Sequence, residues 1–155
     1  MFDISKFNEE LSDIWSTIVG ALMSFVPDRD AIEKVFFLGE STDKMCTCNC
    51  LYQIDGQILN QKGVIDKKGL SEEKHENGIT SILFHCIEEL TRMRDLFEKT
   101  NQEPPKSIKI IYDARKGSLD TEFSYAPITT DDYGMYEAVC DWQEELKAAL
   151  SAEQG

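Results

Sequence analysis

The chain has 155 residues, with 29 aspartates and glutamates against 16 lysines and arginines, and so a formal net charge of −13. This length, together with 41% hydrophobic residues, predicts one folded domain over residues 1–155 and excludes a disordered acidic tail. The acidic balance argues against a nucleic acid as partner, because binding a phosphate backbone would bring like charges together. A basic protein is the partner that this charge favours.

The cysteines are odd in number, and no signal-peptide pattern precedes them. They are Cys46, Cys48, Cys50, Cys86 and Cys140. We therefore expect reduced thiols in a cytoplasmic protein. The longest apolar runs are much shorter than the roughly 20 residues that a membrane-spanning helix needs, so no membrane partner is expected.

Apolar residues recur at intervals of three and four from Ile4 to Phe25, which predicts an amphipathic helix that ends by Pro27. Residues 34–39 then form a short apolar run that is typical of a strand.

Residues 44–54 alternate, with three cysteines on one face, and predict a half-buried strand. Asp55 and Gly56 follow, a dipeptide that accepts the positive φ angles of a tight hairpin turn. We therefore expect residues 57–65 to pair back antiparallel.

The polar stretch 66–77 predicts either a connection, the one candidate for a mobile loop, or the start of the next helix. Residues 79–97 repeat apolar side chains at helical spacing and predict a second long amphipathic helix. Pro104 and Pro105 terminate whatever precedes them, because proline lacks the backbone N–H that a helix needs.

Two further strands are predicted at residues 108–112 and 119–125, joined by a turn at Lys116 and Gly117. In the second strand, alternation places the acidic side chains on the face opposite the aromatic ones.

Residues 127–132 predict a loop in which Thr130 or Asp131 can cap a third helix, with apolar spacing from residue 136 to residue 150. The element order is therefore α-β-β-β-α-β-β-α. Such an order predicts an α+β domain with a mostly antiparallel five-stranded sheet and helices packed on one of its faces.

No catalytic constellation accompanies this fold. The sequence has no serine elbow, no glycine-rich phosphate loop and no dinucleotide fingerprint. His75 and His85 lie too far apart to share a metal on one helix face. Alternate residues of a strand are about 6.5 to 7 Å apart, so Cys46, Cys48 and Cys50 cannot together ligate one zinc ion. We expect no enzyme activity, cofactor or metal, and cysteines that pack as small apolar residues, with a redox role left open.

The charge is concentrated near one end of the chain. From residue 118 onward, nine acids face Lys147 alone, a net charge of −8. Aromatic residues lie among these acids: Tyr133, and either Tyr136 or Trp142 according to the helix register. Aromatic anchors ringed by charge are typical of protein interfaces, although an acidic face can also serve solubility alone.

From residue 102 the sequence reads QEPPKSIKIIY, then a Lys-Gly turn, then LDTEFSY, and finally an acidic loop leading to a helix with a tryptophan. This resembles the YezG-like family of immunity proteins, bacterial antitoxins paired with secreted nuclease toxins. Gly117, Phe123, Tyr125 and Trp142 take the matching places. The upstream order of elements agrees as well, so the resemblance covers nearly the whole chain.

The chain departs from the family pattern at three points. Family members often carry a tryptophan before the fourth strand, where this chain has Lys106 and Ser107. They often carry an acidic residue after the strand-ending tyrosine as well, where this chain has Ala126 and Pro127. The cysteine-rich second strand is not typical of the family.

The resemblance implies a cytoplasmic immunity protein that captures a cognate toxin with a basic surface, as a monomer or a homodimer, and without turnover. The candidate contact residues are Asp120, Glu122, Asp131, Asp132, Tyr133, Glu137, Asp141 and Glu144. The element order also resembles that of class I chaperones of type III secretion, which bind an effector segment as dimers. A stable dimer with an apolar groove would favour this alternative.

Overall fold

A sheet of antiparallel strands organises the fold in the computed structural model, which describes residues 2–43 and 45–154, apart from the side chains of residues 73–77 and 154. Within these residues the sheet has five strands in the order β3-β2-β1-β4-β5. Their bounds are β1 Ile32–Ser41, β2 Cys46–Ile54, β3 Gln57–Leu59, β4 Ser107–Asp113 and β5 Ser118–Ser124. The α+β fold and its antiparallel pairing are thus confirmed.

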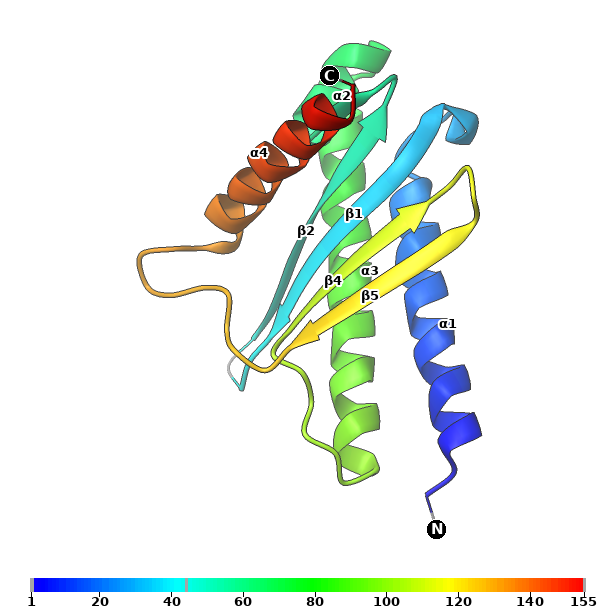
Figure 1. The fold of residues 1–155 in the computed structure, drawn as a ribbon, viewed down its shortest axis with the longest axis vertical. Coiled ribbons are helices and arrows are strands. Elements are labelled where there is room, and N and C mark those ends of the chain that lie inside the picture. The colour runs from blue at the N-terminus through cyan, green and yellow to red at the C-terminus, as the bar shows by residue number, and fades with distance from the viewer. Residues whose placement is uncertain (1, 44, 155) are drawn as a thin grey trace.

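Helices cover both faces of this sheet. The helices are α1 Ile4–Met23, α2 Gln61–Lys68, α3 Glu72–Lys99 and α4 Met135–Gln154, with a short 3-10 turn at Arg29–Ala31. α1 and α3 lie behind the sheet in Figure 1, whereas α4 lies in front of it, on the side of β2. α4 contacts β2 and β3, and Ile111 of β4 packs against the core beneath it, whereas the front of β5 stays open. The expectation that all helices share one face is therefore wrong.

The apolar run of β1 explains this three-layer arrangement. Val35 and Phe37 point into the core beneath α1 and α3, whereas Phe36 and Leu38 point into a second core beneath α4. A strand that is apolar on both faces must be covered on both sides, which is the usual reason for an unbroken hydrophobic run.

The cysteine face of β2 packs into the larger core, as predicted. Cys48 and Cys50 are buried there, together with Cys86 of α3. Desolvation raises the pKa of Cys50 to about 11 and that of Cys86 to about 12, so the thiols stay protonated. Tyr52 continues the same face, and its hydroxyl donates to the Leu22 carbonyl of α1 at 2.6 Å.

The hairpin predicted at Asp55 and Gly56 is confirmed. Both residues have positive φ angles, 51° and 72°, and β2 pairs antiparallel with β3 directly across the turn. This is the geometry in which an Asp-Gly pair fits the twist of its flanking strands.

The pairing ends earlier than the sequence predicted. β3 stops at Leu59, and residues 61–68 form α2, so the prediction of a strand to residue 65 is wrong. The cause is local: the Asn60 side chain accepts from the Gly63 N–H at 2.8 Å and caps the helix. Residues 66–77, expected as a loop or the start of a helix, are helical except at positions 69–71.

Candidate partner-binding site

The eight candidate contact residues come from β5, from the segment between β5 and α4, and from α4 itself. Tyr133 is half-buried and the other seven are exposed. Figure 1 shows the connecting segment, residues 125–134, running from the end of β5 to the start of α4. We call this segment the acidic loop.

A tight turn presents the two aspartates of the acidic loop. The Thr130 N–H donates to the Tyr133 carbonyl at 2.8 Å, and the Tyr133 N–H donates to the Thr130 carbonyl at 3.3 Å. Asp131 and Asp132 therefore occupy the tip of the turn, where both are exposed. The two adjacent negative charges repel each other, and a cation that approaches the tip would reduce this repulsion.

Tyr133 links this turn to α4. Its hydroxyl donates to Asp141 Oδ2 at 2.6 Å, and this bond is the main reason that the pKa of Tyr133 rises to about 12. The bond ties the acidic loop to the exposed flank of the helix. It therefore fixes the position of the turn relative to Asp141.

The start of α4 differs from the prediction that Thr130 or Asp131 caps it. The helix begins at Met135, and the Gly134 N–H donates to Glu137 Oε2 at 3.1 Å. Residues 130–133 form the turn, so the helical backbone begins after them, and the Gly134 carbonyl accepts the first helical bond from the Ala138 N–H at 3.0 Å. Glu137 then serves the helix terminus in the manner of the acid in a capping box.

A buried carboxylate of β1 anchors the other end of the acidic loop. Glu40 is 3% exposed and accepts from the Ile128 N–H at 2.6 Å and the Thr129 N–H at 2.8 Å, and from the Thr129 hydroxyl. Sequence reasoning missed this residue. The available signal was an acid next to an apolar run in a predicted strand, where burial requires hydrogen-bond partners.

Asp120 and Glu122 on β5 form a second group, next to Lys109 of the neighbouring strand β4. Glu122 pairs with Lys109 in the strand register, and Asp120 lies on the same face of the sheet. The Lys109 ammonium lies 5.0 Å from the centroid of the Trp142 ring on α4. Between α4 and the sheet, Lys109, Trp142 and Asp141 help to line a shallow cavity of about 200 Å³.

The structure thus divides the candidate residues. Those of the acidic loop and α4 are contiguous in the chain and are linked by the Tyr133–Asp141 bond. Asp120 and Glu122 stand apart on β5. Lys109 lies between the two groups and interrupts the negative charge.

Of the two aromatic residues that the sequence offered for the exposed face of α4, Tyr136 is the exposed one. Its side chain is 70% exposed, whereas Trp142 is 7% exposed and packs edge-on against Phe36 with ring centroids 5.7 Å apart. Trp142 is therefore a core residue. Tyr136 shares its flank of α4 with Gln143, which donates to the Ile58 carbonyl of β3, so it faces away from Asp141.

The other residues considered for chemistry are dispersed. The His85 ring is exposed and lies 3.7 Å from the Glu88 carboxylate, while the side chain of His75 falls outside the described residues. No three histidines, cysteines, aspartates or glutamates come together as a metal site in the described part of the chain. None of the helices among those residues is long and apolar enough to span a membrane.

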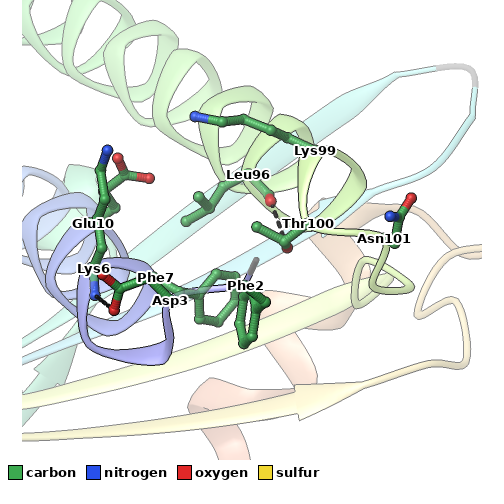
Figure 2. A pocket seen from close by; sticks show the side chains of 9 residues that line it. All are labelled: Phe2, Asp3, Lys6, Phe7, Glu10, Leu96, Lys99, Thr100 and Asn101. Carbon is green, nitrogen blue, oxygen red and sulfur yellow. Dashed lines mark hydrogen bonds between the residues drawn. The ribbon is translucent and has the colours of Figure 1, made fainter.

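A groove of about 370 Å³ opens at the far side, between the start of α1 and the end of α3 (Figure 2). Two of its polar side chains already serve the helix ends. Asp3 accepts from the Lys6 N–H at 3.2 Å, and the Thr100 hydroxyl donates to the Leu96 carbonyl at 2.9 Å. None of the candidate contact residues lies in this groove.

Comparison with known protein families places the chain among immunity proteins. It belongs to the YezG-like family, described as Immunity protein YezG-like, whose profile matches residues 11–151. The match begins inside α1 and ends inside α4, so it includes every strand of the sheet. The family resemblance is thus confirmed. A search of curated proteins finds no match.

Proposed function

We propose that this chain is an antitoxin that binds and neutralises a cognate secreted toxin, one-to-one and without turnover, in the cytoplasm of the cell that produces the toxin. The family match over residues 11–151 carries this proposal. An immunity protein of this kind acts by occupying a surface, so it needs complementary shape and charge and no reactive group.

The charge of the chain supports a nuclease as the toxin. A nuclease must present a positive surface to its phosphate substrate, and an acidic protein can occupy that surface by mimicking the polyanion. The net charge of −13, more than half of it after residue 117, suits such a role.

The acidic loop and the adjacent flank of α4 are the contact surface that we propose. Asp131 and Asp132 at the tip of the turn meet the toxin first, and Glu137, Asp141 and Glu144 extend the negative charge along the helix. Because Glu40 and Asp141 hold the loop at both ends, little conformational entropy is lost when the partner binds.

Asp120 and Glu122 form the second part of this surface, on the open front of β5. Tyr133 supplies the aromatic area of the interface, since Trp142 is enclosed in the core. Charged groups at the rim speed the approach of the partner, while the aromatic contact prolongs the life of the complex.

Co-production with the toxic C-terminal region of a secreted nuclease whose gene adjoins that of this chain tests the proposal. We expect cells to survive, and the purified pair to elute as a one-to-one complex in size-exclusion chromatography with light scattering. Replacing Asp131 and Asp132 with lysine should reduce protection. The matched control carries lysine in place of Asp28 and Asp30, which are exposed acids near the start of β1. This variant should protect the cells as fully as the wild-type chain does. Cell death with the wild-type chain, and no complex, would refute the proposal.

A further inference from the structure

The two edges of the sheet are protected very differently. At the β3 edge the strand has only three residues, and the outward carbonyl of Ile58 accepts from Gln143 Nε2 of α4 at 3.1 Å. At the other edge β5 has seven residues, all exposed, and no described segment lies beyond it. An uncovered edge of that length is a template for another strand.

The hydrogen bonds of β4 show which groups β5 offers at this edge. The Ser41 N–H donates to the Lys106 carbonyl at 2.8 Å, and the Ala114 N–H donates to the Glu33 carbonyl at 3.0 Å. The even-numbered residues of β4 therefore bond to β1, and its odd-numbered residues bond to the even-numbered residues of β5. This leaves the N–H and C=O groups of Leu119, Thr121 and Phe123 at the free edge.

The side chains of β5 divide by the same alternation. Leu119 and Phe123, 37% and 38% exposed, lie on the α1 face, where the Phe123 ring is 6.0 Å from the Trp15 ring between centroids. Asp120 and Glu122 lie on the opposite face. The edge thus has an apolar side and an acidic side.

We propose that β5 takes up an extended segment of the partner protein as a sixth strand, one in which basic residues alternate with apolar residues. The basic side chains face Asp120 and Glu122, and the apolar ones cover Leu119 and Phe123. This inference rests on the proposed function, since the partner is the toxin, and it adds how the toxin is held. Backbone hydrogen bonds give such a strand its affinity, and alternate side chains give it specificity.

Nearby cations leave the acidic side available. Lys109, opposite Glu122 on β4, leans toward α4 and lies over the Trp142 ring. Arg115, in the turn before β5, is held by Glu33 at 3.1 Å. The strand itself carries no lysine or arginine, so a basic residue of the partner meets carboxylates along it.

A second copy of this chain fits the edge poorly. Antiparallel pairing of β5 with itself about Thr121 places Asp120 opposite Glu122 of the other copy. Sliding one strand by two residues in either direction, which keeps the same edge groups paired, places Asp120 opposite Asp120, or Glu122 opposite Glu122. Like charges directly opposite each other destabilise a strand pair, which argues for a basic partner instead.

A blocked peptide, Lys-Val-Lys-Val-Lys-Val-Lys, is the probe. We expect it to bind the wild-type chain and to slow hydrogen exchange at the amides of Leu119, Thr121 and Phe123, with affinity measured by calorimetry. Thr121→Pro removes an N–H at the free edge but none that bonds to β4, and should weaken binding about fivefold or more. Thr121→Val, which keeps the N–H, should bind as the wild type does.

Methylation of the peptide backbone provides a test that does not depend on the folding of a variant. The proposed sixth strand pairs antiparallel, as every described strand pair of the sheet does. Residues that exchange hydrogen bonds then lie directly opposite each other with side chains on the same face, so the valine N–H groups of the docked peptide face β5. Methylation of the central valine nitrogen should abolish binding, and methylation of an adjacent lysine nitrogen should not. Equal loss with both methylated peptides, or no uptake of the unmethylated peptide, would overturn the proposal.

Different experimental outcomes would refute the docking proposal and the immunity role. A chain that protects cells against the toxin but takes up no peptide at β5 refutes the docking proposal and leaves the immunity role standing. A chain that takes up the peptide at β5 but protects no cells refutes the immunity role instead.

Discussion

Two buried glutamates of β1 hold the loops at opposite ends of the sheet. Glu33 accepts from the Gly56 N–H at 2.6 Å and pairs with Arg115, so it connects the β2–β3 turn with the β4–β5 turn. Glu40 anchors the acidic loop. Buried carboxylates of this kind are retained only where donors surround them, because desolvation is otherwise costly.

Replacing Glu40 with glutamine should loosen the acidic loop. The glutamine NH2 group would face donors from Ile128 or Thr129, so we expect a loss of about 2 kcal/mol in the free energy of unfolding. Urea denaturation measures this loss, and hydrogen exchange at Ile128 and Thr129 should accelerate. The control, Glu122→Gln on the exposed β5, should change stability little. Unchanged exchange at Ile128 and Thr129 would show that Glu40 does not anchor the loop.

Replacing Trp142 with alanine should destabilise the second core. The ring packs against Phe36 and under the Lys109 ammonium, so the substitution leaves a cavity and should lower the unfolding free energy by about 3 to 5 kcal/mol. Tyr136→Ala, at an exposed position of the same helix, should stay within about 0.5 kcal/mol of the wild type. Equal effects of the two substitutions in urea denaturation would contradict the assignment of Trp142 to the core.

Among the elements, the sequence predicted those whose signals are local. The Asp55-Gly56 turn needs only its own φ angles, and the alternation of β2 reflects a single buried face. α2 was missed because the apolar residues Ile58, Leu59, Val64 and Ile65 after the turn resembled a continuing strand, although Asn60 supplies a helix cap. The position of α4 depends on tertiary packing, and the prediction placed all helices on one face. The unbroken apolar run of β1 was the unused signal that both faces are covered.

The candidate site was predictable in composition and less so in geometry. The exposed acids of α4 and the acidic loop follow from polar positions in a helix and a loop. The bond from Tyr133 to Asp141 spans eight residues and depends on how the chain turns before the helix. The contact between Glu40 and the loop joins residues 88 positions apart, which no local pattern reveals.

The cysteine face of β2 predicts a loss of stability in alkaline solution. The unfolded thiols ionise near pH 9.0, whereas burial raises the pKa of Cys50 to about 11 and that of Cys86 to about 12. The folded chain therefore keeps protons that the unfolded chain releases, so this contribution is full below pH 9.0 and is lost as the pH rises through the folded values. Urea midpoints should therefore fall between about pH 9 and pH 12. Cys50→Ala should flatten the decline, and an equally steep decline in that variant would contradict this cause.

On the scale of the whole molecule, the charge distribution should control the rate at which the partner associates. Lysine at both Asp131 and Asp132 should slow association with the toxin about tenfold at low salt and reduce the dependence of the rate on salt, with a smaller effect on dissociation. Stopped-flow fluorescence measures both rates. The Asp28 and Asp30 double variant changes the net charge equally at a distant site, and an equal slowing there would show that only the net charge matters.

The position of α4 has a consequence for synthesis on the ribosome. The core beneath α1 and α3 is built from α1–α3 and the strands, and all of these precede the acidic loop and α4 in the chain. Phe36, Leu38 and Leu51 on the other face stay uncovered until α4 emerges. Because the ribosome makes the chain from its N-terminus, this face of the sheet is the last to be covered. A nascent chain would have most of its sheet in place and still lack the segment that we propose restrains the toxin.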